Sequence, residues 1–124
     1  MLVTSLQAFE KYQKEEAWTW EHQALLRTRI ITGSAPVGQE FARIRQSVLA
    51  VKRDPAKICA DVVEMREKMR THLASRDESS INIKQDPGGM VDIEFTTQAG
   101  VLLNAVEHPE MLSVSSTLEF IEYL

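Results

Sequence analysis

Hydrophobic residues recur along this chain at spacings of three and four, which is the period of an amphipathic α-helix. One stripe follows the helix-start signal Ser34-Ala35-Pro36 and comprises Val37, Phe41, Ile44, Val48 and Val51. Asp54-Pro55 then combines a helix cap with the proline that suits a first turn. The stripe after it comprises Ile58, Val62, Met65, Met69 and Leu73. The pattern thus predicts two consecutive helices in the middle of the chain.

The N-terminal part has the same period with less definite boundaries. Thr4-Ser5-Leu6-Gln7 indicates a capping box, because a hydroxyl and a glutamine three residues later can satisfy two free amides. A second helical stretch is expected from about Trp18 to Ile31, with Gly33 as the residue that ends it. The pattern fits one continuous helix and equally two helices that meet near Ala17.

Beyond a polar loop expected at 75–80, the pattern changes. Ile81-Asn82-Ile83-Lys84 alternates apolar and polar side chains, which predicts a short extended segment. Asp86-Pro87-Gly88-Gly89 has the residues of a tight turn. A helix is expected from about Gly89 to Val106, and His108-Pro109 ends it. Its inward-facing residues would be Val91, Phe95, Leu102 and Val106.

A last helix should be capped by one of the hydroxyl residues at 115–117. It would hold Leu118, Ile121 and Leu124. The expected fold class is therefore all-α: a helical bundle of five or six helices, with a short extended segment and a Gly-Gly turn near 81–89.

The length of 124 residues suits one modest core, so residues 1–124 are expected to form a single helical domain. Hydrophobic residues make up 44% of the chain, a globular composition. The chain begins with Leu2-Val3 before any cap and stops inside an apolar helix. These ends predict an excised fragment of a larger protein.

Charge and cysteine usage narrow the expected partners and location. A net charge of −4 gives no support for nucleic-acid binding, which needs clustered basic residues. No apolar run approaches the roughly 20 residues of a membrane span, and no signal-peptide pattern is visible. The single cysteine, Cys59, fits a reducing compartment, so the cytoplasm is the expected location. Because Cys59 falls beside an apolar stripe, a buried structural thiol is favoured over a reactive one.

No complete catalytic motif is visible, and the three histidines lie at no ligand spacing that favours a metal site. Trp18 and Trp20 lie on different faces of a helix. Separate packing of each is favoured over an aromatic platform at a domain interface. The Arg-x-Arg pairs at 27–29 and 43–45 could bind phosphate or carboxylate, but a solvated helix face is the favoured interpretation.

The segment from Lys84 to Phe95 has the strongest indication of a site. Its two glycines permit positive φ and close approach, and free amides at the following helix start would attract anions. Asp92 and Glu94 would oppose a phosphate there unless a cation intervened. Two structural alternatives stay open: these carboxylates cap their own helix, or they pair with Arg66 or Lys84. From chemistry alone, the structural alternatives are favoured.

Three sequence segments, taken in order, favour a binding site over these structural alternatives. They are Glu16-Ala17-Trp18-Thr19-Trp20-Glu21-His22-Gln23-Ala24-Leu25, Glu64-Met65-Arg66-Glu67-Lys68-Met69, and Lys84-x-x-x-Gly88-Gly89-x-x-Asp92-Ile93-Glu94-Phe95. Together they resemble the glutamine synthetase adenylyltransferases, and the resemblance covers nearly the whole chain.

The resemblance implies a bifunctional bacterial enzyme of nitrogen control with two nucleotidyltransferase halves. One half attaches AMP from ATP to a tyrosine of glutamine synthetase, and the other removes it by phosphorolysis. Each half has a mixed α/β core followed by a helical bundle. This chain resembles the bundle after the C-terminal, adenylylating core, because of its Trp-Thr-Trp-Glu-His stretch and because Asp92 stands where the other half usually has Glu. The implied partners are glutamine synthetase, a PII-type signal protein and the core of the same chain.

Chemistry and position within that motif suggest which residues face the nucleotide cleft. The expected cofactor-binding residues are Lys84, Gly88, Gly89, Asp92, Glu94 and Arg66. Lys84 would neutralise phosphate charge, and Asp92 or Glu94 would orient Arg66 or a metal-bound water.

The chain departs from the family pattern in one important respect. The family core carries a Gly-x-x-x-Ser-Asp-type loop and an Asp-x-Asp pair that holds Mg²⁺, and neither is present here. ATP and Mg²⁺ are therefore expected in the full-length enzyme, while the fragment alone should bind neither and should not catalyse. The alternatives are a non-catalytic docking module for glutamine synthetase or a PII-type protein, and the bundle of a related uridylyltransferase.

Overall fold

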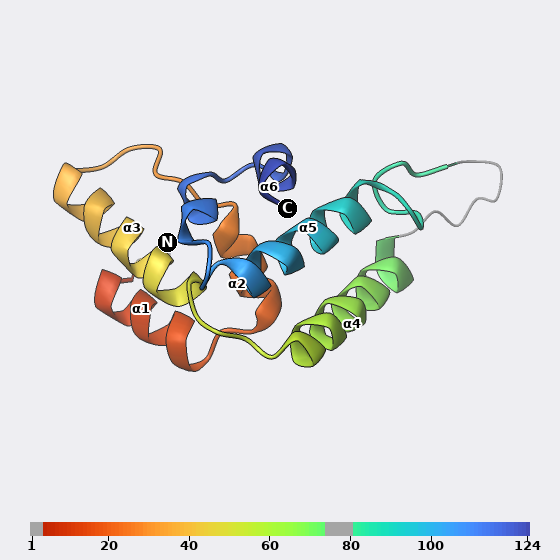
Figure 1. The fold of residues 1–124 in the computed structure, drawn as a ribbon, viewed down its shortest axis with the longest axis horizontal. Coiled ribbons are helices and arrows are strands. Elements are labelled where there is room, and N and C mark those ends of the chain that lie inside the picture. The colour runs from red at the N-terminus through yellow and green to blue at the C-terminus, as the bar shows by residue number, and fades with distance from the viewer. Residues whose placement is uncertain (1–3, 74–80) are drawn as a thin grey trace.

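The computed structural model describes residues 4–73 and 81–124, so the polar loop expected at 75–80 lies outside the described residues. All regular structure in the described residues is helical, which confirms the all-α class. Figure 1 shows α1 (Leu6–Glu15), α2 (Thr19–Leu26), α3 (Ala35–Leu49), α4 (Pro55–Leu73), α5 (Met90–Asn104), the 3₁₀ helix η1 (Pro109–Ser113) and α6 (Thr117–Tyr123).

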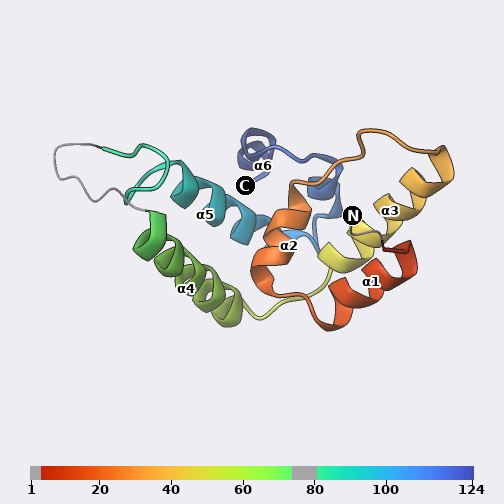
Figure 2. The ribbon, with the colours of Figure 1, turned by 180° about the vertical axis from the view of Figure 1, so that it is seen from behind.

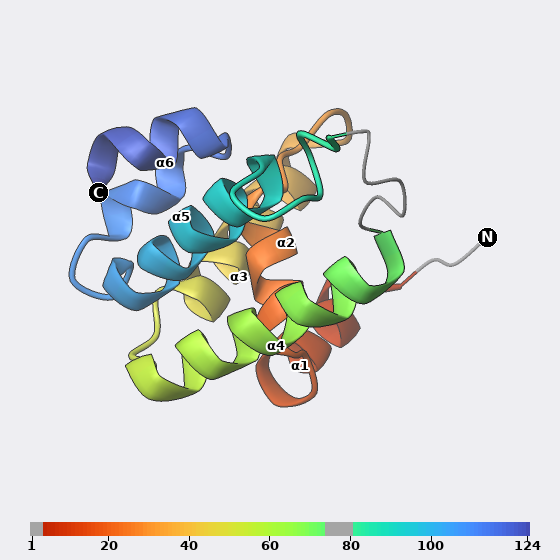
Figure 3. The same ribbon diagram turned by 90° about the vertical axis from the view of Figure 1, so that its right-hand side faces the viewer.

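Helix α2 is the centre of the arrangement, because it contacts α3, α4 and α5. Figures 1 and 2 show α1 and α3 together at one end of the molecule, with α4 and α5 at the other. Figure 3 shows α6 above α5, on the side away from α4. The short central helix thus links two helix pairs.

The N-terminal region forms two helices, which decides the question left open at Ala17. The first is capped by Ser5, whose hydroxyl accepts the amide of Ala8 at 3.1 Å, so the box predicted at Thr4 and Gln7 is wrong by one residue. The second begins after Trp18, whose backbone is extended and whose amide donates to Glu21 at 2.8 Å.

Helix α2 ends at Leu26, earlier than expected, and Gly33 is not its final residue. The physical reason is tertiary. The guanidinium of Arg45, from α3, binds the carbonyl oxygens of Leu25 and Leu26, which a longer helix would use for its own hydrogen bonds. Gly33 instead takes a positive φ of 135° in the connection to α3.

The two middle helices start where the sequence predicts. The carboxylate of Asp54 accepts the amide of Ala56 at 3.0 Å ahead of α4. Only Ile58 and Arg66 are buried on α4, because this helix covers α2 and α5 with one narrow face. Cys59 is exposed, so the prediction of a buried thiol is wrong. It lies about 100° around the helix from Ile58.

The segment predicted to be extended at 81–84 becomes a turn from Ile83 onward. The side-chain oxygen of Asn82 accepts the amides of Lys84 and Gln85, at 3.1 and 3.0 Å. This local competition by an asparagine side chain favours a turn over extended backbone. The Gly-Gly turn follows, and α5 begins at Met90 as expected.

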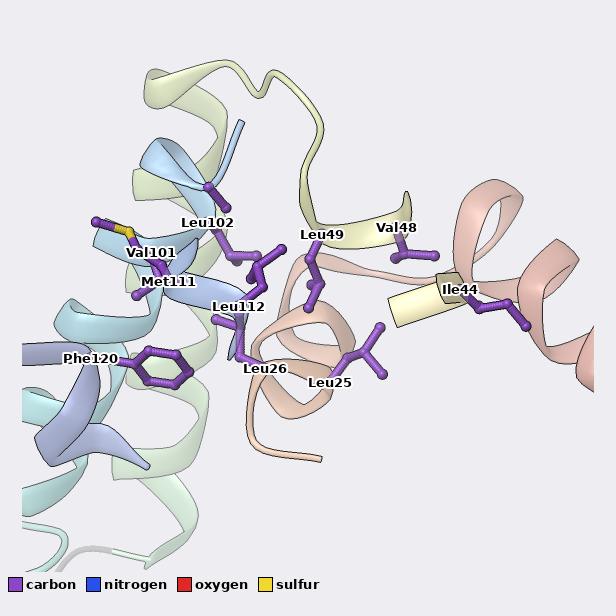
Figure 4. Close-up of a cluster of buried hydrophobic side chains, with 11 residues drawn as sticks. Leu25, Leu26, Ile44, Val48, Leu49, Val101, Leu102, Met111, Leu112 and Phe120 are labelled. Atoms are coloured by element: carbon purple, nitrogen blue, oxygen red, sulfur yellow. The ribbon is translucent and has the colours of Figure 1, made fainter. Parts of the chain in front are cut away.

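The core is one cluster that joins both ends of the molecule (Figure 4). It comprises Leu25, Leu26, Ile44, Val48, Leu49, Val101, Leu102, Ala105, Met111, Leu112 and Phe120. Seven residues of the predicted apolar stripes are exposed: Val37, Val51, Leu73, Val106, Leu118, Ile121 and Leu124. In α6 the buried residue is Phe120, which belongs to this cluster, so the predicted inward face of this helix is wrong.

Among the described residues, no helix is both long enough and apolar enough to cross a membrane.

Candidate functional site: an arginine–aspartate cluster between two helices

The carboxylate of Asp92, in the first turn of α5, faces helix α4. Its Oδ1 accepts from Nε of Arg66 at 2.5 Å. Its Oδ2 accepts from Nη2 of Arg70 at 3.2 Å and from the amide of Gly88 at 2.5 Å. Both carboxylate oxygens are therefore engaged, and the structural alternative in which Asp92 pairs with Arg66 is the one observed.

Arg66 connects α4 to the loop as well as to α5. Its side chain is 6% exposed, and its Nη2 donates to the carbonyl of Gln85 at 2.6 Å. A longer contact, 3.5 Å, reaches the carbonyl of Asp86. A buried guanidinium needs such partners, since desolvation of an unpaired charge is costly.

Electrostatics keep Asp92 ionised. The Arg66 guanidinium, followed by the amide of Gly88, holds the pKa of the Asp92 carboxyl below its ordinary value. Burial opposes this shift, but the charge-assisted hydrogen bonds outweigh it. The ionised pair then gives α4, the loop and α5 a common anchor.

The amides at the start of α5 are not free to bind an anion, contrary to the expectation from sequence. Besides the Gly88 amide, the amide of Gly89 donates to Asp86, that of Met90 to Ile83 and that of Val91 to Lys84, at 2.9, 3.0 and 3.2 Å. The loop folds back on itself and satisfies these donors. An anion would have to displace internal hydrogen bonds to bind them.

Glycine is required at positions 88 and 89 for two different structural reasons. Gly88 adopts a φ of +81°, which favours glycine. At Gly89 the backbone is extended, but a β-carbon would lie 2.8 Å from the carbonyl oxygen of Asp86 and 3.1 Å from that of Lys84. The turn therefore requires glycine at both positions for its own folding.

The other two candidate residues lie apart from this cluster. Glu94 forms an ion pair of 2.8 Å with Arg27, the residue directly after α2, so Glu94 does not orient Arg66. Lys84 is exposed, and its ammonium has no ion-pair partner within 4–73 and 81–124. Of the six candidates, the structure brings together Arg66, Asp92 and the two glycines.

A cavity of about 230 Å³ opens between α4 and α5 beside the cluster. Arg66, Arg70 and Asp92 line it together with Val62, Phe95 and Thr96. Nη1 of Arg66 and Nε of Arg70 are buried and have no hydrogen-bond partner in the described part of the chain. Arg70 was not among the predicted site residues, although its place one turn after Arg66 could have indicated it.

The described residues contain no group of three or more acidic, histidine or cysteine side chains that could hold a metal ion. His22 has a structural role: its Nε2 contacts the carbonyl of Gln13 at 2.9 Å and its Nδ1 contacts Arg53 at 3.1 Å. Burial lowers the pKa of His22 and favours its neutral form.

One further expectation from the sequence is wrong, and another is right for Arg27, Arg29 and Arg43 but wrong for Arg45. Trp18 and Trp20 are exposed, where separate packing against neighbours was expected. Of the two Arg-x-Arg pairs, Arg43 does lie on a solvated face and pairs with Glu10 and Glu40, but Arg45 is buried.

The N-terminal part of the chain matches the sequence model of a known family. A sequence model of the family described as glutamate–ammonia ligase adenylyltransferase matches residues 1–44. The match ends before the Arg66–Asp92 cluster, so it is independent of that motif.

Individual relatives extend the match to the whole chain. It is 50% identical over 124 residues to the bifunctional glutamine synthetase adenylyltransferase/adenylyl-removing enzyme of Thioalkalivibrio sulfidiphilus, and 47% identical to that of Shewanella loihica. The relative from Xanthomonas campestris is 44% identical over 123 residues. All of this chain or 99% of it is covered, but only 13% of each relative. These matches confirm the resemblance to glutamine synthetase adenylyltransferases.

Proposed function

We propose that this chain is the helical part of a bifunctional adenylyltransferase and deadenylylase that transfers AMP from ATP to a tyrosine of glutamine synthetase. It would follow the C-terminal, adenylylating nucleotidyltransferase core of a cytoplasmic enzyme. The observation that carries the proposal is 50% identity, across all 124 residues, to a relative with that name. By itself the chain would be inactive, because the Asp-x-Asp pair of the family core is absent.

Within such an enzyme, the Arg66–Asp92 pair would act as a positioning contact. It holds the loop at 82–89 against α4 through the carbonyl of Gln85, and the same loop carries the exposed side chain of Lys84. A lysine on an ordered loop loses less conformational entropy on meeting a phosphate than one on a free loop. We therefore assign phosphate contact to Lys84, and loop positioning to Asp92 and to the Nε and Nη2 atoms of Arg66.

The cluster fits the phosphates of ATP better than it fits Mg²⁺. The unpartnered donors Nη1 of Arg66 and Nε of Arg70 suit an oxyanion beside the cavity. Both oxygens of Asp92 already accept hydrogen bonds, which leaves it a poor magnesium ligand. ATP brings the reacting phosphoryl group when bound, and the metal would be held by residues outside this chain.

A chimera tests the overall assignment. The matching segment of the Thioalkalivibrio sulfidiphilus relative is replaced by this chain, and AMP incorporation into glutamine synthetase is measured. We expect activity within about tenfold of the parent, because a shared core tolerates substitution when volume and patterning are kept. A chimera that folds but transfers no AMP would overturn the assignment.

The same chimera tests the role of Lys84. Lys84→Ala should raise the KM for ATP several-fold, and Lys52→Ala, another exposed lysine, serves as the matched control. An unchanged KM and kcat in Lys84→Ala would remove Lys84 from the nucleotide site while leaving the family assignment intact.

Exposure of Trp18 and Trp20 favours a second candidate, a docking module for glutamine synthetase or a PII-type protein. Large aromatic side chains are enriched at protein interfaces. Calorimetry of this chain with each purified partner tests it. Micromolar binding that is lost in Trp18→Ala would support docking, and no heat of binding with either partner would reject it.

A further inference from the structure

We propose that the cavity between the end of α2, α3 and η1 binds a small organic carboxylate through Arg29 and Arg45. This cavity has a volume of about 410 Å³ and shares no lining residue with the cavity beside Asp92. The inference therefore goes beyond the adenylyltransferase role and does not depend on it. It rests on the charge, the hydrogen bonding and the apolar lining of this cavity.

Arg45 brings a buried positive charge to the cavity. The residue is 9% exposed, and its guanidinium donates to four carbonyl oxygens: Leu25 and Leu26 at the end of α2, Leu112 in η1, and Val114. None of these acceptors carries a formal charge, although the end of a helix dipole offsets part of the guanidinium charge. Arg66 by contrast faces the carboxylate of Asp92.

One N–H group of the Arg45 guanidinium remains without an acceptor in the part of the chain that the structure describes. A guanidinium has five N–H groups, and the four contacts use Nε once, Nη1 once and Nη2 twice. The second N–H of Nη1 has no acceptor among the described residues. Burial lowers the pKa of Arg45, as expected for a cation that lacks a nearby anion. A carboxylate oxygen would supply both the missing acceptor and the missing charge.

Arg29 places a second guanidinium at the same cavity. It lies in the connection after α2, is exposed, and has no ion-pair partner within 4–73 and 81–124. No acidic residue lines the cavity, and its other polar side chains are the neutral Thr28, Gln46, Ser113 and Ser115. Two cations without an anion between them create a local positive potential, which favours an anionic ligand.

The remaining lining is apolar and selects the rest of the ligand. Ile30, Phe41, Leu112 and Val114 form this part of the wall, together with Pro109. Binding sites for small molecules combine such apolar walls with a few polar groups, and typical volumes begin near 300 Å³. A carboxylate with an apolar body matches both halves of the cavity better than a bare inorganic anion does.

The test uses the 124-residue chain, labelled with ¹⁵N and titrated with benzoate while amide shifts are recorded. Benzamide serves as the neutral ligand of the same shape, and inorganic phosphate as the anion without an apolar body. We expect saturable shifts around Arg29, Leu112 and Ser113 with benzoate. Dissociation constants for the other two probes should be at least about tenfold higher, as expected when a charge-assisted hydrogen bond or the apolar contact is lost.

Two variants separate the site from general surface charge. Arg29→Gln should weaken benzoate binding at least about fivefold, since it removes one charged donor. Arg43→Gln removes the same charge from the outer face of α3 and should leave binding unchanged. Arg45→Gln is not used alone, because it would also release the end of α2.

Three results would overturn the proposal. The first is an absence of saturable shifts with benzoate. The second is equal affinity for benzoate and either of the other probes. The third is unchanged binding in Arg29→Gln, with a spectrum that shows the variant is folded.

Discussion

Arg66 and Asp92, 26 residues apart in the chain, meet at 2.5 Å between α4 and α5. This contact joins α4 to the first turn of α5, and Figure 3 shows the two helices. The same Arg66 also holds the loop through the carbonyl of Gln85. Through these two contacts, Arg66 connects α4, the loop before α5 and α5 itself.

Asp92→Asn should destabilise the fold by about 1 to 3 kcal/mol, because it leaves the buried Arg66 without a counter-charge. The estimate stays below the full value for a buried pair, since the Asp92 side chain is 24% exposed. Urea unfolding followed by circular dichroism measures the change. Glu67→Gln is the control: it removes an exposed partner of Arg70 and should cost at most about 1 kcal/mol. Equal stability of Asp92→Asn and the parent would show that the pair does not stabilise the fold.

The same pair predicts a pH dependence. The pKa of Asp92 is lower in the folded chain than its ordinary value of 3.8, so the folded state binds fewer protons at this group. Its contribution is therefore complete above the ordinary pKa and is lost as the pH falls through the folded pKa. The difference in unfolding free energy between the parent and Asp92→Asn should be constant above about pH 5 and shrink below about pH 4.

A difference curve is needed because other carboxylates, among them Asp61 and Glu10, also have lowered pKa values. Their contributions are common to the parent and the variant and cancel. A difference that stays constant down to about pH 2.5 would contradict the assignment of this titration to Asp92.

Gly89→Ala should destabilise the chain by about 1 to 3 kcal/mol, the usual cost of forcing atoms into a packed position. The added β-carbon would lie 2.8 Å from a backbone carbonyl oxygen, which cannot move without opening the turn.

Gly38→Ala is the matched control for Gly89→Ala. Its β-carbon would meet the flexible, half-exposed side chain of Ile30 at 3.2 Å, inside helix α3. We expect the control to be neutral or up to about 1 kcal/mol more stable, because alanine favours a helix. Similar thermal midpoints for both variants would contradict the packing argument.

Phe120→Ala should cost about 3 to 5 kcal/mol, because it opens a cavity in the core at a fully buried aromatic side chain. Leu118→Ala, two residues earlier on the same helix, is the control and should change stability by about 0.5 kcal/mol or less. Leu118 is 70% exposed. Urea denaturation of both variants checks the prediction, and an equal loss in the two would show that α6 does not pack as described.

The hydrophobic pattern was sufficient for the class of fold and for the middle helices. The stripe at 37–51 and the cap at Asp54 predicted α3 and α4 closely, because period and capping are local properties. The choice of inward face was less secure. Leu118 and Ile121 formed the expected stripe of the last helix, but the core position belongs to Phe120. A short helix has too few apolar positions to define one face, so its neighbours decide which side is buried.

In the candidate site, too, the sequence predicted one part and the tertiary structure decided the other. The sequence pointed to the right segment through its Gly-Gly turn and its acidic residues. It could not choose between partners for those acids, and the tertiary structure paired Asp92 with Arg66 and Glu94 with Arg27. Pairing of charges depends on how the helices pack against one another, and no local pattern contains that arrangement.

Local chemistry thus determined where most helices start and that all regular structure in the described residues is helical. Packing decided where α2 ends, because the carbonyl oxygens of Leu25 and Leu26 bind the guanidinium of Arg45 from the next helix. Packing also turned the start of α5 from an expected anion site into a closed turn, since its amides found acceptors within the loop. Hydrogen-bond donors and acceptors are visible in the sequence, but which of them remain free is settled only when the chain has folded.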